Sequence, residues 1–588
     1  MLTAVLTTIA FLTPQDAASF DQGYRLSALA TLGSKPAATI VVPDDDPHRL
    51  EVKFVDGSGV QLVGGSLQAL SPEVYSIDEY LTELGAVRHR VYSQSDDWLQ
   101  AFRASGEAHS GRPLHDLTLF YGVELHGEGL IAEVCDALNA FDIVEIAYPL
   151  PRVSDPVIAP APSTSAPLVT PNYEGLQGYR GPAPTGIDAD YGNTFSGGAG
   201  LGTTIADVET GWTDDHEDIA HKAQGSFVGL PNAPYPWDHG TAVLGELVGE
   251  HNSWGVRGSC YDSDVLLSTH EGSSSNIPTA VMNAIAAVVP GDAVLLEIQC
   301  YSSMPGPHPC ETVPSIFAAV EAATANGIHV FAASGNGDNN LDSGAYGGLF
   351  DRNVRDSGAV LVGASDGATL NKASFSNYGS RLDAHGWGWD VVTSGYGDLQ
   401  GGPVTQQYTS AFSGTSSASP IVTGAGVILN SIHRTVLGTP IDPLVLRSLL
   451  TSTGTPQGSG GSIGPRPNVR AAIDSLNLPR IEVSGNLVPG GQYTVTSQGP
   501  GNAVYVLTFA AGLRNNPWSS PWGEFFLASP WGRVKSGILP ASGVADFQAT
   551  IPNDPALSGT TYGYYQGWQR FAGTNGGSFA NYAPINVQ

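Results

Sequence analysis

Apolar and polar positions repeat with different periods along the chain, and the changes of period mark its domain boundaries. Between residues 48 and 150, runs that alternate like strands stand beside runs with helical spacing. The expected strands are 49–55, 117–125 and 141–148, and the expected helices are 97–104 and 129–140. This pattern predicts a small α+β unit of about a hundred residues.

Residues 173–478 change to apolar strands that alternate with helices, which is the pattern of an α/β domain with a parallel sheet. The expected strands include 202–208, 293–300 and 328–333. One helix is expected from His239 to Gly249, and a second, apolar on nearly every side, through residues 421–429. Polar residues fall where these strands end, and ligands gather there in open parallel sheets.

Two other segments differ in composition from these domains. Prolines are frequent between residues 149 and 172, which predicts an exposed, easily cut linker. After about residue 479, short alternating runs separated by turn signals predict an all-β sandwich. The predicted plan is a signal peptide at 1–18, the α+β domain at 19–150, the linker at 151–172, the α/β domain at 173–478 and the sandwich at 479–588.

The charge balance argues against two classes of partner. Asp and Glu number 55 against 25 Lys and Arg, which gives a net charge of −30. Such a field repels nucleic acid and anionic membranes. The apolar run within residues 1–18 resembles a secretory signal without its basic start, and it is too short to span a bilayer. A secreted, soluble protein without a membrane span is therefore expected.

The four cysteines suggest one disulfide. Cys300 and Cys310 flank a short Pro-rich stretch, and in an exported protein a bond between them would stabilise the fold by roughly 2–3 kcal/mol. Cys260 with Cys300 is the competing pair. Cys135 is expected to remain a buried thiol, and no cysteine spacing indicates zinc.

Ser416 stands where the second predicted helix begins. A hydroxyl there lies beside unpaired backbone N–H groups and the positive end of the helix dipole, which favour negative charge on a bound carbonyl oxygen. Ser416 is therefore a candidate nucleophile. The alternative interpretation is that Ser416 only caps the helix, because serine is a preferred N-cap residue.

Three motifs of this domain resemble those of the subtilisin family of serine endopeptidases. They are residues 207–211, 239–245 and 414–420, and they supply Asp, His and Ser in the chain order that the family has. The first motif departs from the family, in which Ser or Thr and then Gly directly follow the aspartate. Here Val208, Glu209 and Thr210 precede Gly211.

The resemblance implies a role for each motif. Ser416 attacks the peptide carbonyl, His239 takes and returns its proton, and Asp207 orients the imidazole. The amide of Asn336, together with the Ser416 backbone N–H, is expected to stabilise the oxyanion. Taken alone, Asn336 between two glycines is more typical of a turn than of an oxyanion site.

By the same resemblance, Gln299, Cys300 and Tyr301 align with the strand that binds the substrate, which in the family reads Ser-Leu-Gly. Extended peptides are expected to pair there as an added strand, in a cleft narrowed by the bulkier side chains. Glu297, in the preceding apolar strand, is expected either to pair with a buried donor or to have a raised pKa.

The N-terminal α+β domain resembles the propeptide that precedes such catalytic domains. The resemblance implies that it assists folding and then inhibits the cleft through the residues after Tyr148, with cleavage in the linker. The expected partners are protein or peptide substrates and the chain's own propeptide. No cofactor is expected to be required, although calcium is a possible structural ion in this family.

Three other functions are alternatives to this one. An inactive relative could bind through the C-terminal sandwich, whose aromatic residues are Trp518, Trp522, Trp531, Tyr562, Tyr564, Tyr565 and Trp568. An acid-acting serine-carboxyl peptidase would use a Glu base and an oxyanion Asp, in conflict with His239 and Asn336. An α/β-hydrolase esterase would have its serine first in the chain.

Overall fold

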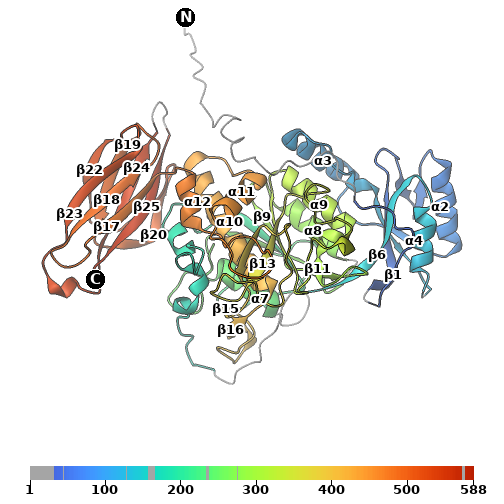
Figure 1. Cartoon of the computed structure of the whole chain (residues 1–588), viewed down its shortest axis with the longest axis horizontal. Coiled ribbons are helices and arrows are strands. Elements are labelled where there is room, and N and C mark those ends of the chain that lie inside the picture. Colours follow the sequence, from blue (N-terminus) through green and yellow to red (C-terminus); the bar gives the residue numbers. More distant parts are fainter. Residues whose placement is uncertain are drawn as a thin grey trace, which may run out of the picture.

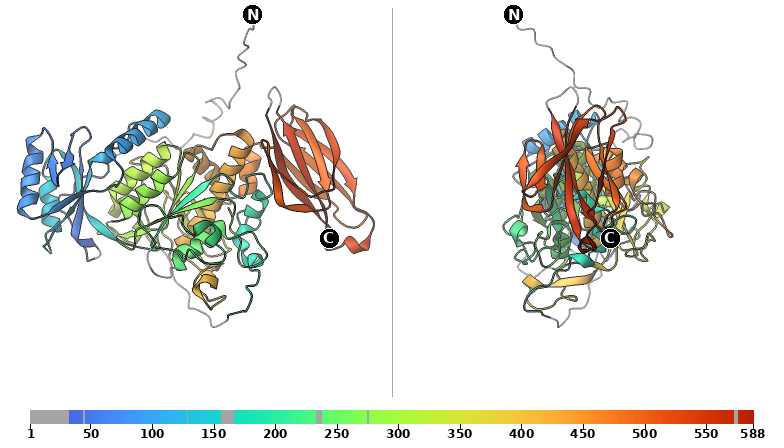
Figure 2. Two further views of the ribbon diagram at one scale, coloured as in Figure 1. Left: turned by 180° about the vertical axis from the view of Figure 1, so that it is seen from behind. Right: turned by 90° about the vertical axis from the view of Figure 1, so that its left-hand side faces the viewer.

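The computed structural model describes residues 32–43, 45–127, 129–155, 166–232, 238–273, 276–571 and 576–588. Three domains follow one another along the longest axis of the molecule (Figure 1). The α/β domain lies in the middle, with the α+β unit on one side and the sandwich on the other, as the view from behind also shows (Figure 2).

The N-terminal unit is built on an antiparallel sheet, and it contains β1 (Asp45–Phe54), β2 (Gln61–Val63), β3 (Ser66–Gln68), α2 (Pro72–Glu83), β4 (Val87–Arg90), α3 (Asp96–Ser110), β5 (Phe120–Glu124), α4 (Ile131–Asn139) and β6 (Val144–Ser154). Leu50 and Val52 of β1 share a buried core with Leu81 of α2 and Leu138 of α4. Helix α3 instead packs toward the middle domain, where Leu99 joins the core of that domain.

The middle domain contains a six-stranded parallel sheet in the order β14-β13-β12-β9-β7-β8. Its strands are β7 (Thr204–Glu209), β8 (Asp264–Thr269), β9 (Ala293–Leu296), β12 (His329–Ala333), β13 (Val360–Ser365) and β14 (Ala384–Trp387). The main helices are α7 (Asp238–Val248), α8 (Ile277–Ala287), α9 (Pro314–Ala325), α10 (Thr415–Leu437), α11 (Pro443–Thr453) and α12 (Val469–Ser475).

Helices cover both faces of this sheet, which explains why its strands read as continuous apolar runs. Ala293 and Leu295 of β9 belong to the core that contains α7 and α10, whereas Val294 and Leu296 belong to the core that contains α8 and α9. Strands buried on both faces lose the alternation of half-exposed strands. The predicted α/β fold with a parallel sheet is confirmed.

Strand β6 connects the N-terminal unit to the middle domain. Its first part pairs with β1, and its last part, Arg152–Ser154, pairs antiparallel with β10 (Gln299–Tyr301). The pairing gives one sheet in the order β11-β10-β6-β1-β5-β4, where β11 is His308–Pro309. The strand thus continues through residues that the sequence pattern placed in the linker.

The C-terminal domain has two antiparallel sheets around one core, as predicted. One sheet is β17-β18-β23, the other is β22-β19-β24-β25, and a hairpin β20-β21 flanks them. The strands are β17 (Arg480–Gly485), β18 (Gln492–Gln498), β19 (Val504–Ala510), β20 (Leu513–Ser520), β21 (Gly523–Leu527), β22 (Trp531–Ile538), β23 (Val544–Thr550), β24 (Thr561–Arg570) and β25 (Gly577–Asn586). Tyr565 lies in the core, whereas Trp518, Trp522 and Trp531 are exposed.

The sandwich docks on the middle domain through its hairpin and β25. The backbone N–H of Glu524 donates to the Ser196 hydroxyl at 2.6 Å, and the N–H of Gly197 donates to the Glu524 carboxylate at 3.1 Å. The N–H of Tyr582 donates to the carbonyl of Thr194 at 3.0 Å.

The structure differs from one sequence expectation at β9 and β10. The expected strand 293–300 is interrupted, because β9 ends at Leu296 and β10 begins at Gln299 with a different partner. The expected signal peptide lies outside the described residues. Within the described part of the chain, no helix is both long enough and apolar enough to cross a bilayer.

Candidate active site

The end of β7 places two carboxylates on the same side of the sheet. Asp207 and Glu209 are two residues apart in a strand, so their side chains point the same way. Both are fully buried. Burial raises the pKa of Asp207 to about 7, and it raises the pKa of Glu209 well above its usual range, with further contributions from the negative charges of Asp207 and Asp155.

Glu209 contacts the imidazole of His239. Nδ1 of His239 lies 2.8 Å from each of the two carboxylate oxygens of Glu209. His239 is the second residue of α7, and the edge of its ring faces the ring of Phe412 at 5.6 Å between centroids. An Nδ1–H donated to Glu209 leaves Nε2 as the nitrogen that can accept a proton.

The predicted pairing of Asp207 with His239 is wrong. One oxygen of Asp207 accepts a hydrogen bond from Nε1–H of Trp212 at 2.9 Å, and the other has no partner among the described residues. Asp207 therefore supports the turn that follows β7. A Cβ added to Gly240 would lie 2.6 Å from the Trp212 ring, so this turn also packs tightly against the start of α7.

Ser416 is the second residue of α10, a helix of 23 residues. Gly414 caps the helix at φ +100°, a value that favours glycine. The Ser416 side chain is fully buried, and its hydroxyl has no hydrogen-bond partner in the described part of the chain. Neither has Nε2 of His239. A serine serving only as an N-cap would use its oxygen on a backbone N–H, so the capping interpretation is not supported.

Asn336 is oriented by the start of the same helix. Its side-chain carbonyl accepts from the backbone N–H of Thr415 at 2.9 Å and from the Thr415 hydroxyl at 3.1 Å. These bonds fix the side chain so that its amide nitrogen is the remaining donor, and that nitrogen is buried without a partner among the described residues. The amide nitrogen of Asn336 is thus an unused donor near the start of α10, the helix that contains Ser416.

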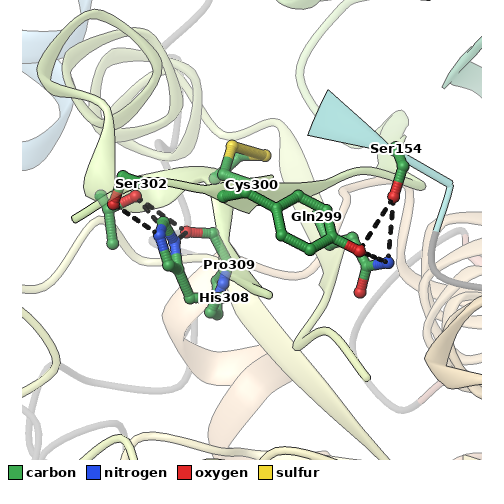
Figure 3. The surroundings of a disulfide bond; sticks show 9 residues. Ser154, Gln299, Cys300, Ser302, His308 and Pro309 are labelled. Atoms are coloured by element: carbon green, nitrogen blue, oxygen red, sulfur yellow. Dashed lines mark hydrogen bonds between the residues drawn. A yellow bond between two sulfur atoms is a disulfide. The ribbon is translucent and has the colours of Figure 1, made fainter. Parts of the chain in front are cut away.

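The predicted substrate-binding residues form a short strand that lies between β11 and β6. Gln299, Cys300 and Tyr301 make up β10, and they pair with Ser154, Val153 and Arg152. Figure 3 shows Gln299 facing Ser154 across this pairing. Nε2 of Gln299 donates to the Ser154 hydroxyl at 3.1 Å, and Oε1 accepts from the backbone N–H of Asn336 at 2.9 Å.

A disulfide holds the other side of this strand. Cys300 is bonded to Cys310, while Cys135 and Cys260 are buried free thiols, so the predicted pairing is confirmed. The bond closes the loop between β10 and the residues after β11, and Figure 3 shows the disulfide at Cys300. It therefore fixes the strand that Gln299 begins.

Val153 lies on the side of β6 that faces the core of the middle domain. It packs against the core that contains α8 and α9. A small cavity there is lined by Leu150, Pro151, Val153, Ile277, Pro278, Cys300, Val313 and Ile316. On the opposite face of β6, the Arg152 guanidinium lies 4.3 Å from the centre of the Tyr301 ring.

Asp155 brings a third carboxylate to the site. Its carboxylate accepts from the Thr210 hydroxyl at 2.8 Å. Single oxygen or nitrogen atoms of Asp155, Glu209 and His239 all lie within 4.8 Å of one another. The N-terminal unit thus reaches the Glu209–His239 pair with the residue that follows β6.

Sequence reasoning missed Glu209, although a signal was present. Thr210 and Gly211 directly follow Glu209, so the family's Ser/Thr-Gly pair is intact and only the acid before it is longer by one methylene. The shift of the motif by two residues identifies Glu209. The contribution of Asp155 had no local signal, because it depends on the pairing of distant strands.

The described residues give little support to a calcium site. Two groups of three His, Asp or Glu side chains converge, and both include a histidine, which is not a typical calcium ligand. One group is the Asp155, Glu209 and His239 set. In the other, around Asp56, Nζ of Lys53 already supplies the positive charge at 2.6 Å. These residues do not fit the ion.

The chain also matches known proteins over this domain. A model described as the subtilase family matches residues 200–465, the range that holds Glu209, His239, Asn336 and Ser416. Subtilisin Savinase from Lederbergia lenta is 31% identical over 271 residues, which cover 45% of this chain and 88% of that protein. Subtilisin from Bacillus pumilus is 29% identical over 284 residues, covering 47% and 92%.

Among solved structures, fervidolysin from Fervidobacterium pennivorans, described as a keratinolytic enzyme related to subtilisin, covers 95% of this chain and 76% of its own, at 15% identity and a TM-score of 0.49. The sequence relatives carry the assignment. With its parallel sheet, its three motifs and these relatives, the chain belongs to the subtilase family of serine peptidases.

Proposed function

We propose that the protein is a secreted endopeptidase in which Ser416, His239 and Glu209 form the catalytic triad. Ser416 attacks the peptide carbonyl while Nε2 of His239 accepts its proton. The same nitrogen then returns the proton to the leaving amine, and water completes hydrolysis of the acyl-enzyme. Glu209 holds the imidazole by Nδ1 and stabilises its charged form, the role that the family resemblance predicts for Asp207.

The observation that carries this proposal is the pair of 2.8 Å contacts between His239 Nδ1 and Glu209, which leaves Nε2 unpartnered among the described residues. A buried imidazole nitrogen without a hydrogen-bond partner costs free energy. That cost is explained if the nitrogen accepts and returns a proton during catalysis. An inactive binding protein would have no need of this arrangement.

Asn336 and the Ser416 backbone N–H are the proposed oxyanion donors. The bonds from Thr415 to the Asn336 carbonyl oxygen support this role, because they leave the amide nitrogen directed elsewhere. Asn336→Ala is expected to lower kcat by about 10²–10³-fold, the usual effect of removing one such donor. Asn336→Asp tests the serine-carboxyl alternative, in which an Asp stabilises the oxyanion at acid pH. This variant is expected to show no more activity at acid pH than Asn336→Ala.

Substrates are proposed to bind as an extended strand on β10. The pairing of Arg152–Ser154 with Gln299–Tyr301 supports this, because backbone pairing of that kind needs no particular side chain. Subsite preference then follows from the pockets beside the strand. The cavity around Val153 favours an apolar residue at the position that Val153 occupies.

The N-terminal unit is proposed to inhibit the enzyme until it is cut away. While β6 lies on β10, a substrate strand cannot take the same edge. Asp155 adds a negative charge beside Glu209, which raises the pKa of Glu209 further. We expect the cut to fall between Asp155 and residue 172, with export to the outside of the cell by the N-terminal segment.

Expression of the full chain and of Ser416→Ala tests the proposal. The parent chain is expected to release its N-terminal unit, digest casein and react with a fluorophosphonate probe, and the variant is expected to do none of these. N-terminal sequencing of the processed parent locates the cut. Equal casein digestion by both chains would exclude Ser416 as the nucleophile.

A further inference from the structure

One buried carboxyl close to the active site has no role in the reaction described above. Glu297 directly follows β9, and its side chain is fully buried. Its Oε1 lies within hydrogen-bond distance of the Ser419 hydroxyl, one helical turn after Ser416, and its Oε2 has no partner among the described residues. Glu297 therefore joins the strand region before the substrate edge to the helix of the nucleophile.

Among the described residues, the ionisable groups around Glu297 are mostly acidic, and His239 is the one base that they include. The ionisable groups that face it are Asp207 and Glu209 on β7 and His239 and Glu246 on α7. No lysine or arginine in the described part of the chain forms an ion pair with it. An ionised carboxylate with one bare oxygen, beside three other carboxyls, would be costly in a buried position.

The hydrogen bonds of Ser419 indicate that Glu297 carries the proton that lies between the two side chains. Its hydroxyl also lies 2.7 Å from the carbonyl oxygen of Thr415, which can only accept. A serine has one hydroxyl proton, and when that proton goes to Thr415 the oxygen can only accept from Glu297. Both contacts are then satisfied if Glu297 is the donor. Burial and the charge of Glu209 raise the pKa of Glu297 well above its usual range, which agrees with this assignment.

We propose that Glu297 is a neutral carboxylic acid that positions the active site by donating a hydrogen bond to Ser419, and that its ionisation sets the alkaline limit of activity. The inference rests on the proposed peptidase function and adds a positioning residue to it. Gln299, two residues further on, holds the backbone of Asn336, so the bond links the nucleophile helix to the oxyanion side of the cleft. Loss of the proton would force Ser419 to give up Thr415 in order to donate to the carboxylate, and it would add a negative charge beside Glu209.

Two substitutions at these positions separate the proposal from a purely structural role. In Glu297→Gln the side-chain amide still donates to Ser419 but cannot ionise. At pH 6 its kcat/KM is expected within about threefold of the parent, whereas the alkaline fall of the pH profile is expected to move up by about one pH unit or more. Glu297→Leu, which cannot donate, is expected to lose about tenfold or more in kcat.

Ser419→Ala tests the direction of the hydrogen bond. If Ser419 accepts from the acid, its removal destabilises the protonated form and lowers the pH of the alkaline fall. If Ser419 instead donates to a carboxylate, the same change raises it. An upward shift in Ser419→Ala, or a Glu297→Gln profile that coincides with the parent's, would overturn the proposal.

Infrared spectroscopy gives a readout that does not depend on activity. In a Ser416→Ala background at neutral pH, Glu297→Gln is expected to remove a protonated-carboxyl band. Glu311→Gln is the matched control, because Glu311 also pairs with a serine hydroxyl, that of Ser357, but forms an ion pair with Arg381 at 3.5 Å. Unchanged bands in Glu297→Gln would contradict the inference even if Ser416 is the nucleophile.

Discussion

The two domains that flank the catalytic domain are attached to it in different ways. The N-terminal unit shares a sheet with the substrate edge through β6, and its hydrophobic core continues into that of α8 and α9. The sandwich docks through a hairpin and a few backbone hydrogen bonds around Ser196. The first contact occupies β10, the proposed substrate-binding strand, and the second involves other residues.

Polar contacts also distinguish the two interfaces. Across the first, the Tyr92 hydroxyl donates to the carbonyl of Ser315 at 2.6 Å, and Arg112 pairs with the buried Glu321 at 2.5 Å. Burial raises the pKa of Glu321 to about 7, and Arg112 opposes this rise. In the proposed function, release of the N-terminal unit must follow cleavage, since an uncut chain would pair again. The proposed inhibitor and the sandwich thus differ in the surface that each one covers.

The largest expected effect on this contrast comes from Val153→Asp. A carboxylate forced into the apolar cavity beside Val313 should weaken binding of the cut N-terminal unit by about 3 kcal/mol, or about a hundredfold. The measurement is the inhibition constant of the released unit against the processed enzyme. Val153→Ala is the milder control. An unchanged inhibition constant for both variants would show that β6 does not pair with β10 in solution.

Gly523→Ala should disturb the other interface. Gly523 has φ +98°, and an added Cβ would lie 2.4 Å from the Ser196 hydroxyl oxygen. We expect a loss of stability of about 1–3 kcal/mol by thermal unfolding, with kcat/KM on a short peptide changed by less than about twofold. A large fall in kcat/KM would mean that the sandwich takes part in the active site.

Glu51→Gln should change the pH dependence of the uncut chain. Burial raises the pKa of Glu51 from 4.5 to about 7, while the Tyr148 hydroxyl donates to it at 2.5 Å. The protonated form is favoured in the folded state, so its contribution is complete below pH 4.5 and is lost as the pH rises through about 7.

The glutamine variant cannot lose a proton, so at pH 8 it should be more stable than the parent by roughly 1–3 kcal/mol. Denaturant unfolding of the Ser416→Ala chain with and without this change, at pH 5 and pH 8, measures the difference. Equal stabilities at pH 8 would contradict the assignment.

The smallest effect is expected for Arg152→Ala. Its guanidinium lies 4.3 Å from the centre of the Tyr301 ring on the exposed side of β6. Loss of a cation–π contact at such a site costs about 0.5–1 kcal/mol, so the inhibition constant should rise by about two- to fivefold. An increase in the inhibition constant as large as that of Val153→Asp would show that side-chain contacts, more than strand pairing, hold β6 on β10.

The order of domains and the main elements could be predicted because they follow from local patterns. The apolar run at Ala293 reflects burial on both faces of the sheet, and the buried helix after Ser416 reflects its place in the core. The continuation of β6 beyond Pro149 could not be predicted in this way, since its partner is Gln299 and lies far away in sequence.

The carboxylate that contacts His239 was predicted wrongly for a different reason. Asp207 and Glu209 lie on the same face of one strand, and both precede the motif's glycine. A sequence pattern that expects aspartate selects Asp207. The structure distinguishes them by their hydrogen bonds. Glu209, at the end of the strand, contacts His239, whereas Asp207 accepts from Trp212.

The most direct test of the catalytic centre compares kcat/KM of Glu209→Gln and Asp207→Asn on one peptide substrate, with folding checked by circular dichroism. We predict that Glu209→Gln loses about 10³–10⁴-fold, because the imidazole loses the partner that sets its tautomer and stabilises its charge. Asp207→Asn should lose about tenfold or less, since Asn can still accept from Trp212. The opposite order of effects would contradict the account and return the catalytic role to Asp207.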